Sequence, residues 1–340
     1  MKYEKEELLK LRDKNLKNAV LGRYPFQGGI KYYVAKRSAF LRPSTISEEE
    51  KKLRYFAKVF EELKTNGLVQ RTDPRYISGS DVAAFFEWMQ KKDLDVVARQ
   101  KYVQILNHYL MIFGNNAIDR IRVQDGIRLP RSSEAKPIRT LSTSDLRRIF
   151  TVAESMEGWN GIIIRGVISI LFSSGCRPKE VLQAKTEDLR MDIGSYGTFY
   201  VRHPKGEGSY ASAQDVRLIR GDMKGYILDF LRDRNEYLSK AGLSLDYLFP
   251  NLETGLPLTS NSIRRYKDEL AKRSGVSFKL KDFRSTLASM VIKGDITRMK
   301  AASCQLRHSS IRTTERYYAA IERGKIIDDI VDVWKEDPIR

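Results

Sequence analysis

The spacing of apolar residues in the first part of the chain is typical of α-helices. Apolar side chains recur every three or four positions, which is the period of one helix face, in segments 47–67, 78–93 and 95–114. Gly67 and Gly114 are the last residues of the first and third segments, as expected where a helix ends. Residues 22–37 are too irregular to assign. This part of the chain predicts a small helical bundle.

The second part has the same periodicity with one β-type interruption. Helical spacing predicts helices at about 144–156, 161–173 and 178–185, and again from 223 to the end. Between residues 197 and 219, Val, Phe and Tyr flank a glycine-rich turn, and DVRLI follows as a return strand. The expected fold class is therefore mainly α (α+β), with a small antiparallel sheet or hairpin in an otherwise helical domain.

A basic, proline-containing stretch, residues 128–146, separates the two parts and predicts a linker within it. Ser144 near its end is expected to cap the helix that follows. Its cations, candidates for contacts to an anionic partner, are Arg128, Arg131, Lys136 and Arg139. The predicted parts are a basic N-terminal arm (1–45), a helical domain (46–130), a linker (131–140) and an α-rich domain (141–340).

The charge balance adds a prediction about partners. Lys and Arg number 61 against 43 Asp and Glu, which gives a net charge of +18. A surplus of this size indicates a polyanionic partner, and nucleic acid is the one we expect. Two cysteines and three histidines support neither a disulfide framework nor a zinc site. Without an apolar run long enough for a bilayer or a signal peptide, we expect no membrane association and a reducing, cytoplasmic location.

The segment SSGCRPKEVL suggests a site for an anion. Gly175 is expected to end one helix and Pro178 to begin the next, so Arg177 lies beside unpaired backbone N–H groups. The planar guanidinium of an arginine suits phosphate oxygens, and Glu180 is one turn away, where it can hold Arg177. The alternative is a surface helix cap with a local ion pair, and this motif alone does not decide between them.

Two further motifs place cations where a ligand could meet them. Lys205 lies in HPKGEGSY, at the tip of the predicted hairpin, although most such lysines are solvated turn residues. In LKDFRSTLASMVI, Lys281 and Arg284 are neighbours on the rim of a helix whose apolar face should be core. The alternative for this pair is a solvated basic edge. Asp282 lies on a different side of the helix.

The segment LRHSSIRTTERYYAAI contains two adjacent tyrosines that helical spacing makes unequal. Ser309 can cap a helix that follows His308. In that helix Ile311 and Tyr318 share a face, which should be buried, and Tyr317 lies about 100° away. If the helix persists through both residues, Tyr318 packs in the core and Tyr317 is free to react.

These motifs, in this order, resemble the tyrosine recombinase (phage integrase) family. The segment RHSSIRTTERY (307–317) follows the family's GHSSIxTTxxY nearly residue for residue, and the resemblance runs from about 140 to 325. The helical part before it resembles the family's core-DNA-binding domain. Lys281 stands where the family usually has His, and Arg307 where it usually has Gly. The KxxR spacing and the basic N-terminal arm are more similar to archaeal plasmid and virus integrases; an Xer-like member is the alternative.

The resemblance implies a site-specific recombinase that cleaves and rejoins double-stranded DNA through a 3′-phosphotyrosyl intermediate and a Holliday junction, with no metal, cofactor or ATP. Tyr317 would be the nucleophile. The residues around the phosphate would be Arg177, Lys205, Lys281, Arg284 and His308, with Glu180 in a supporting role.

The resemblance also implies a homo-tetramer on a specific recombination site and a monomer or dimer in the absence of DNA. The apolar spacing of KIIDDIVDVW (325–334) suits a C-terminal helix that packs either on a neighbouring protomer or on its own domain. The competing hypotheses are a type IB topoisomerase-like enzyme and a DNA-binding protein without catalysis. A metal-dependent nuclease or transposase is less favoured because the sequence has no evident carboxylate cluster.

Overall fold

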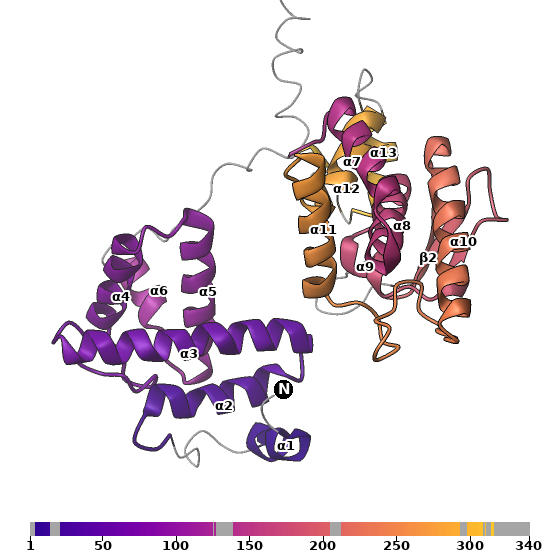
Figure 1. Cartoon of the computed structure of the whole chain (residues 1–340). Helices are drawn as coiled ribbons and strands as arrows, with labels where there is room; N and C mark the ends of the chain where they lie inside the picture. Colours follow the sequence, from indigo (N-terminus) through magenta and orange to yellow (C-terminus); the bar gives the residue numbers. More distant parts are fainter. Residues whose placement is uncertain are drawn as a thin grey trace, which may run out of the picture. The chain divides into compact units, whose positions relative to one another are not determined.

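The computed structural model describes residues 4–13, 21–124, 126, 139–204, 212–292, 298–308, 310 and 314–315. The chain divides into two compact units, one on each side of the boundary between Glu134 and Ala135 (Figure 1). Among the described residues no helix combines the length and apolarity needed to cross a bilayer.

The first unit is a bundle of α-helices. They are α1 (Lys5–Asp13), α2 (Pro25–Arg37), α3 (Pro43–Thr65), α4 (Gly79–Lys91), α5 (Val96–Ile112) and α6 (Ala117–Gln124). The core includes three aromatic rings. The centroid of the Phe26 ring lies 5.1 Å from that of Phe60 and 4.7 Å from that of Tyr109. Ser78 and Asp81 form a capping box at the start of α4. The three helices predicted from periodicity are α3, α4 and α5.

Helix α2 forms although its segment looked irregular in the sequence. Pro25 occupies its first turn, where the missing N–H costs nothing, and Phe26, Ile30 and Tyr33 are buried at helical spacing. Gly29 within the helix permits a close approach, because an added Cβ would lie 2.4 Å from the Tyr109 hydroxyl oxygen. The segment therefore joins the core of the first unit through contacts distant in sequence.

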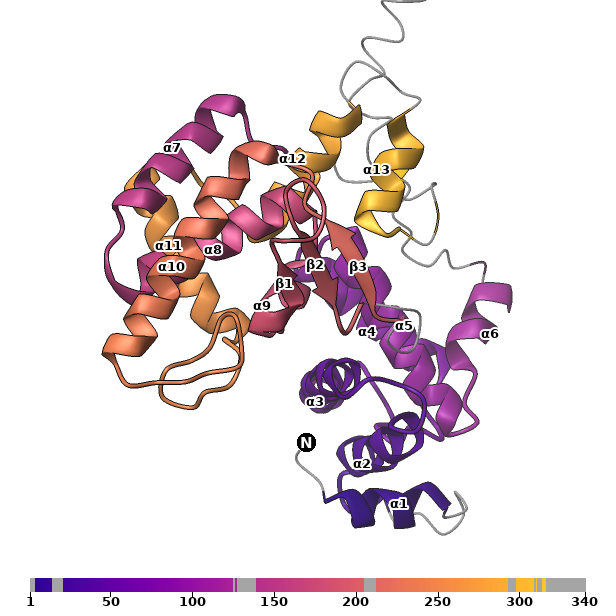
Figure 2. The same cartoon turned by 90° about the vertical axis from the view of Figure 1, so that its right-hand side faces the viewer.

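In the second unit, several helices pack around one central helix, α8 (Gly158–Ser174; Figure 2). Its helices are α7 (Thr143–Ser155), α8 (Gly158–Ser174), α9 (Pro178–Leu182), α10 (Lys224–Lys240), α11 (Ser260–Ser274), α12 (Leu280–Ile292) and α13 (Met299–Leu306), with short 3-10 turns η2 (Thr186–Asp188) and η3 (Gly221–Met223). Helix α8, apolar on nearly all sides, packs against α7, α10, α11 and α12.

A small antiparallel sheet completes the second unit. Its strands β1 (Leu189–Arg190), β2 (Thr198–Val201) and β3 (Gln214–Arg217) lie in the order β1-β2-β3, with Phe199 opposite Val216. The predicted fold class, mainly α with a small antiparallel sheet, is confirmed. Ser142, not Ser144, caps α7, since its hydroxyl accepts from the Asp145 N–H.

Residues 241–259, within the part expected to be mainly helical, form a loop instead. Arg234 of α10 holds this loop and is only 3% exposed. Its guanidinium donates hydrogen bonds to the carbonyls of Leu245, Tyr247 and Leu248 at 2.6–3.0 Å. Arg234 therefore satisfies several carbonyls of this loop, and turn-type hydrogen bonds such as that from the Asn251 N–H to the Leu256 carbonyl order the rest of it.

Candidate active site

Arg177 lies between two helices because the chain turns there. Gly175 ends α8 in the left-handed conformation (φ 69°), and Pro178 begins α9, so that Arg177 is the N-cap residue of α9. Glu180 accepts the Arg177 N–H at 2.8 Å and the Arg177 Nη1 at 3.1 Å. The Arg177 side chain keeps 31% exposure, so part of its guanidinium remains accessible to a ligand.

Arg284 of α12 joins the ends of two other helices. Its guanidinium donates to the carbonyl of Gly175, after α8, and to the carbonyl of Leu306, the last residue of α13, the latter at 2.6 Å. Burial and the nearby Arg177 lower the pKa of Arg284 to about 10. Arg284 therefore keeps its charge at neutral pH and holds the C-terminal end of α13.

Arg307 adds a third guanidinium. Its side chain is 8% exposed, and Nη2 lies 2.5 Å from Glu180 Oε2. Burial by itself raises the pKa of Glu180, but Arg307 and Arg177 outweigh burial, and the pKa lies below its ordinary value. One ionised carboxylate thus contacts two arginines.

His308 follows directly and is neutral at physiological pH. Burial, together with the charges of Arg284 and Arg177, lowers the pKa of His308 to about 4. Its Nδ1 lies 2.8 Å from the hydroxyl oxygen of Thr314, a residue with no exposed surface. When this hydroxyl donates to Nδ1, the ring hydrogen is on Nε2, which can donate to an oxygen of a ligand.

Gln305 connects the sheet to this cluster. Its Nε2 donates to the carbonyls of Ser174 at 2.8 Å and Arg217 at 2.9 Å, at the ends of α8 and β3. The strand that returns from the predicted hairpin is thereby attached to α13, the helix that precedes His308.

The cluster of Arg177, Glu180, Arg284, Arg307 and His308 carries an excess of positive charge. Three guanidiniums face one carboxylate and a neutral imidazole, which leaves two uncompensated positive charges among these residues. Donors fixed by the ends of α8, α9 and α13 suit a phosphodiester, whose oxygens accept from guanidinium and imidazole N–H groups.

Several predicted site residues are not in this cluster as described. Lys281 is exposed on α12, one turn before Arg284, and the Arg139 guanidinium donates to the carbonyl of Ser277. Outside the described residues lie Lys205, Tyr317, Tyr318, Arg128, Arg131, Lys136 and segment 325–334. The predicted difference between the two tyrosines therefore stays a prediction.

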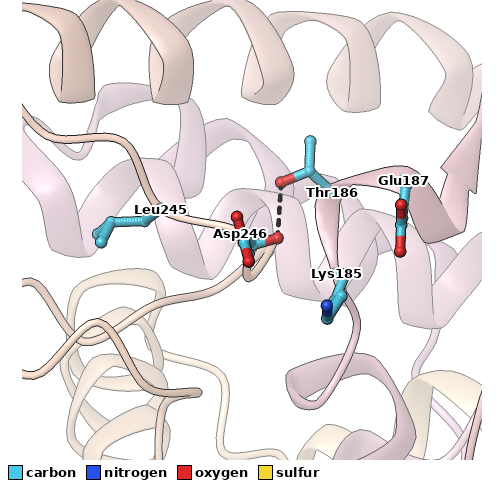
Figure 3. A pocket seen from close by; sticks show the side chains of 5 residues that line it. All are labelled: Lys185, Thr186, Glu187, Leu245 and Asp246. Atoms are coloured by element: carbon cyan, nitrogen blue, oxygen red, sulfur yellow. Dashed lines mark hydrogen bonds between the residues drawn. The ribbon is translucent and has the colours of Figure 1, made fainter.

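A separate hollow of about 300 Å³ lies between η2 and the loop held by Arg234 (Figure 3). Lys185, Thr186, Glu187, Leu245 and Asp246 line it, and the Thr186 hydroxyl donates to the carbonyl of Asp246 at 3.0 Å. None of the predicted site residues whose positions are described lines this hollow, and its lysine and two carboxylates do not resemble the cationic cluster.

Comparison with known proteins identifies the family to which this chain belongs. The model of the phage integrase family matches residues 139–323. The chain belongs to the phage integrase family. The prediction from the sequence motifs, a tyrosine site-specific recombinase that breaks and rejoins DNA strands, is thereby confirmed.

Relatives and solved structures agree with the match. Tyrosine recombinase XerD of Listeria monocytogenes serotype 4b is 23% identical over 283 residues, which cover 82% of this chain and 88% of the relative. XerH recombinase in a post-cleavage complex with a palindromic difH substrate has a TM-score of 0.65 at 16% identity and covers 91% of this chain and 85% of its own. A lambda integrase tetramer bound to a Holliday junction has a TM-score of 0.56 at 17% identity, covering 83% and 76%. These structures share the fold.

Two contacts of the cluster were not predicted from the sequence. The sequence showed Arg307 only as an added charge in place of glycine, and its pairing with Glu180 joins residues 127 positions apart. Thr314 was part of the family motif, but nothing in the motif indicated that its hydroxyl lies beside His308 Nδ1. The sequence signal for the Arg307–Glu180 contact was the arginine itself, which stands where the family usually has glycine.

Proposed function

We propose that Tyr317 is the nucleophile of this recombinase and that Arg177, Arg284 and His308 hold the scissile phosphate. The phenol of Tyr317 gives its proton to a base, its oxygen attacks phosphorus and forms a bond to it, and the bond from phosphorus to the 5′-oxygen breaks. The assembly of two guanidiniums and a neutral imidazole beside the ends of α8 and α13 supports this proposal. Such donors stabilise the charge that grows on the non-bridging oxygens in the five-coordinate transition state.

The remaining roles concern protons and orientation. Lys205 donates a proton to the departing 5′-oxygen, and Lys281 contributes a further positive charge beside the phosphate. Glu180 orients Arg177, as their two hydrogen bonds suggest. Because the phosphotyrosyl ester keeps the energy of the broken bond, attack by a 5′-hydroxyl reseals the strand without ATP. The cations supply the charge stabilisation, so the scheme includes no metal ion or other cofactor.

The partner in this proposal is double-stranded DNA with a specific recombination site. The helical first unit, which includes α1 and α2 of the basic segment 1–45, acts as the core-DNA-binding domain, and the cations of the linker contact DNA phosphates. Strand exchange proceeds through a Holliday junction in a homo-tetramer, by analogy with the lambda integrase tetramer bound to a Holliday junction. The protein is a monomer or dimer without DNA and acts in the cytoplasm.

A nicked suicide duplex carrying the DNA that flanks the gene tests the nucleophile. The wild-type protein should form a covalent protein–DNA adduct in the presence of EDTA. Tyr317→Phe should abolish the adduct, because it removes the attacking oxygen. Tyr318→Phe is the matched control and should retain the adduct.

An adduct that persists in Tyr317→Phe would refute the assignment. Exchange of strands between two duplexes, measured with the wild-type protein on intact sites, separates a recombinase from a topoisomerase-like enzyme. The latter would relax supercoiled DNA without exchanging strands.

A further inference from the structure

Arg307 adopts a backbone conformation that favours glycine. It ends α13 with φ 55° and ψ 49°, and among the described non-glycine residues Asp93 is the other one with positive φ. A side chain at such a position crowds its own backbone, and helices commonly end there with glycine. An arginine at this place therefore indicates a contact of its side chain that offsets the backbone strain.

That contact is the buried ion pair with Glu180. Both side chains are more than nine-tenths buried, at 8% and 4% exposure. Glu180 Oε2 receives the Arg307 Nη2 and also the backbone N–H of Arg177, and Glu180 Oε1 receives the Arg177 Nη1. The carboxylate thus connects Arg307, at the end of α13, with Arg177, at the start of α9.

The remaining donors of Arg307 strengthen the case for a positioning role. Its Nε and Nη1 are buried and have no hydrogen-bond partner among the residues that the structure describes. Buried donors without an acceptor oppose folding, so neither an optimised core nor a surface charge accounts for this arginine. Its contact with Glu180 is the one that touches a residue of the proposed phosphate site.

We propose that Arg307 is a positioning residue for DNA cleavage: it holds the Glu180 carboxylate, and Glu180 holds Arg177 against the scissile phosphate. Without Arg307, Glu180 would have Arg177 as its remaining cation and would draw that guanidinium away from the phosphate. With Arg307 in place the carboxylate is shared, and one face of Arg177 stays available to the ligand. This inference rests on the proposed role of Arg177.

The test is the single-turnover rate of adduct formation on the suicide duplex at saturating DNA. Arg307→Gly relieves the backbone strain and removes the guanidinium. We expect the rate to fall about 10- to 100-fold, because small misplacements of a positioning group reduce rates by such factors. Arg307→Lys keeps the charge and should restore part of the rate. Asp93→Gly is the matched control, since it also places glycine at a positive φ (48°) but in the first unit, and should cleave as the wild type does.

A double-mutant cycle shows whether Arg307 acts through Glu180. In a Glu180→Gln background, Arg307→Gly should slow cleavage by less than about threefold, because the carboxylate that Arg307 holds is already gone.

Wild-type cleavage by Arg307→Gly would overturn the inference while leaving the proposed function intact. An equal loss of rate in both backgrounds would also overturn it. If the wild-type protein forms no adduct on any duplex, the proposed function falls, and this inference with it.

Discussion

Lowering the pH should destabilise the folded protein through His308. Burial and two arginines lower its pKa from 6.5 to about 4 in the folded state, while the unfolded chain keeps the ordinary value. As the pH falls below 6.5, His308 becomes protonated in the unfolded chain but stays neutral in the folded chain. The contribution of neutral His308 to stability is therefore fully present above pH 6.5 and is lost between pH 6.5 and about 4.

The size of the effect follows from the shift. A fall from 6.5 to about 4 corresponds to roughly 3 kcal/mol at 1.36 kcal/mol per pKa unit. His308 is only partly buried, so solvent screens the two arginine charges. We therefore expect a loss of about 1–2 kcal/mol in the free energy of unfolding.

Denaturant unfolding at pH 7.5, 6.0 and 4.5 measures this loss when wild type is compared with His308→Gln. Titration of carboxylates affects both proteins and cancels in the difference between them. The wild type should lose about 1–2 kcal/mol more than the variant between pH 7.5 and 4.5. Identical pH dependence in the two proteins would refute the argument that the arginines and burial keep His308 neutral.

Two other substitutions test the surroundings of the site. Thr314→Val removes the hydroxyl that lies beside His308 Nδ1 and should slow adduct formation about tenfold, the equivalent of one hydrogen bond. Thr314→Ser keeps the hydroxyl and should retain the wild-type rate. Equal rates for the two variants would contradict the idea that this hydroxyl orients His308. Gly166→Ala places a Cβ 2.4 Å from the Phe230 ring and should reduce the free energy of unfolding by about 1–3 kcal/mol in a denaturant titration. An increase in the free energy of unfolding would show that α8 and α10 can separate without cost.

The elements that could be predicted from the sequence are those whose pattern is local. Helix α8 is apolar on nearly all sides, and Gly175 and Pro178 mark the turn that places Arg177. Helix α2 could not be predicted, because Gly29 weakens its pattern and the packing on Tyr109 that favours it is distant in sequence. The loop held by Arg234 was missed because part of its order comes from this side chain on α10, in addition to hydrogen bonds within the loop itself.

The candidate site shows the same division. The sequence motifs predicted Arg177, Arg284 and His308 as site residues, and in the structure these residues lie around the ends of α8 and α13. The sharing of Glu180 between two arginines could not be predicted, because Arg307 reaches it from another element. Long-range pairs of this kind depend on how the helices pack, and spacing along the chain carries no information about that.

Arg284 shows how a buried cation is retained where no carboxylate contacts it directly. Burial and two neighbouring arginines all lower its pKa, yet its guanidinium donates to the carbonyls of Gly175 and Leu306. These carbonyls lie at helix C-termini, the negative ends of the helix dipoles, where a cation is favoured. A carboxylate in their place would neutralise the charge, whereas carbonyl dipoles stabilise it and leave its remaining N–H groups able to bind an anion. The ends of α8 and α13 therefore hold the Arg284 guanidinium in place before an anion binds, which is the preorganisation that the proposed phosphate site requires.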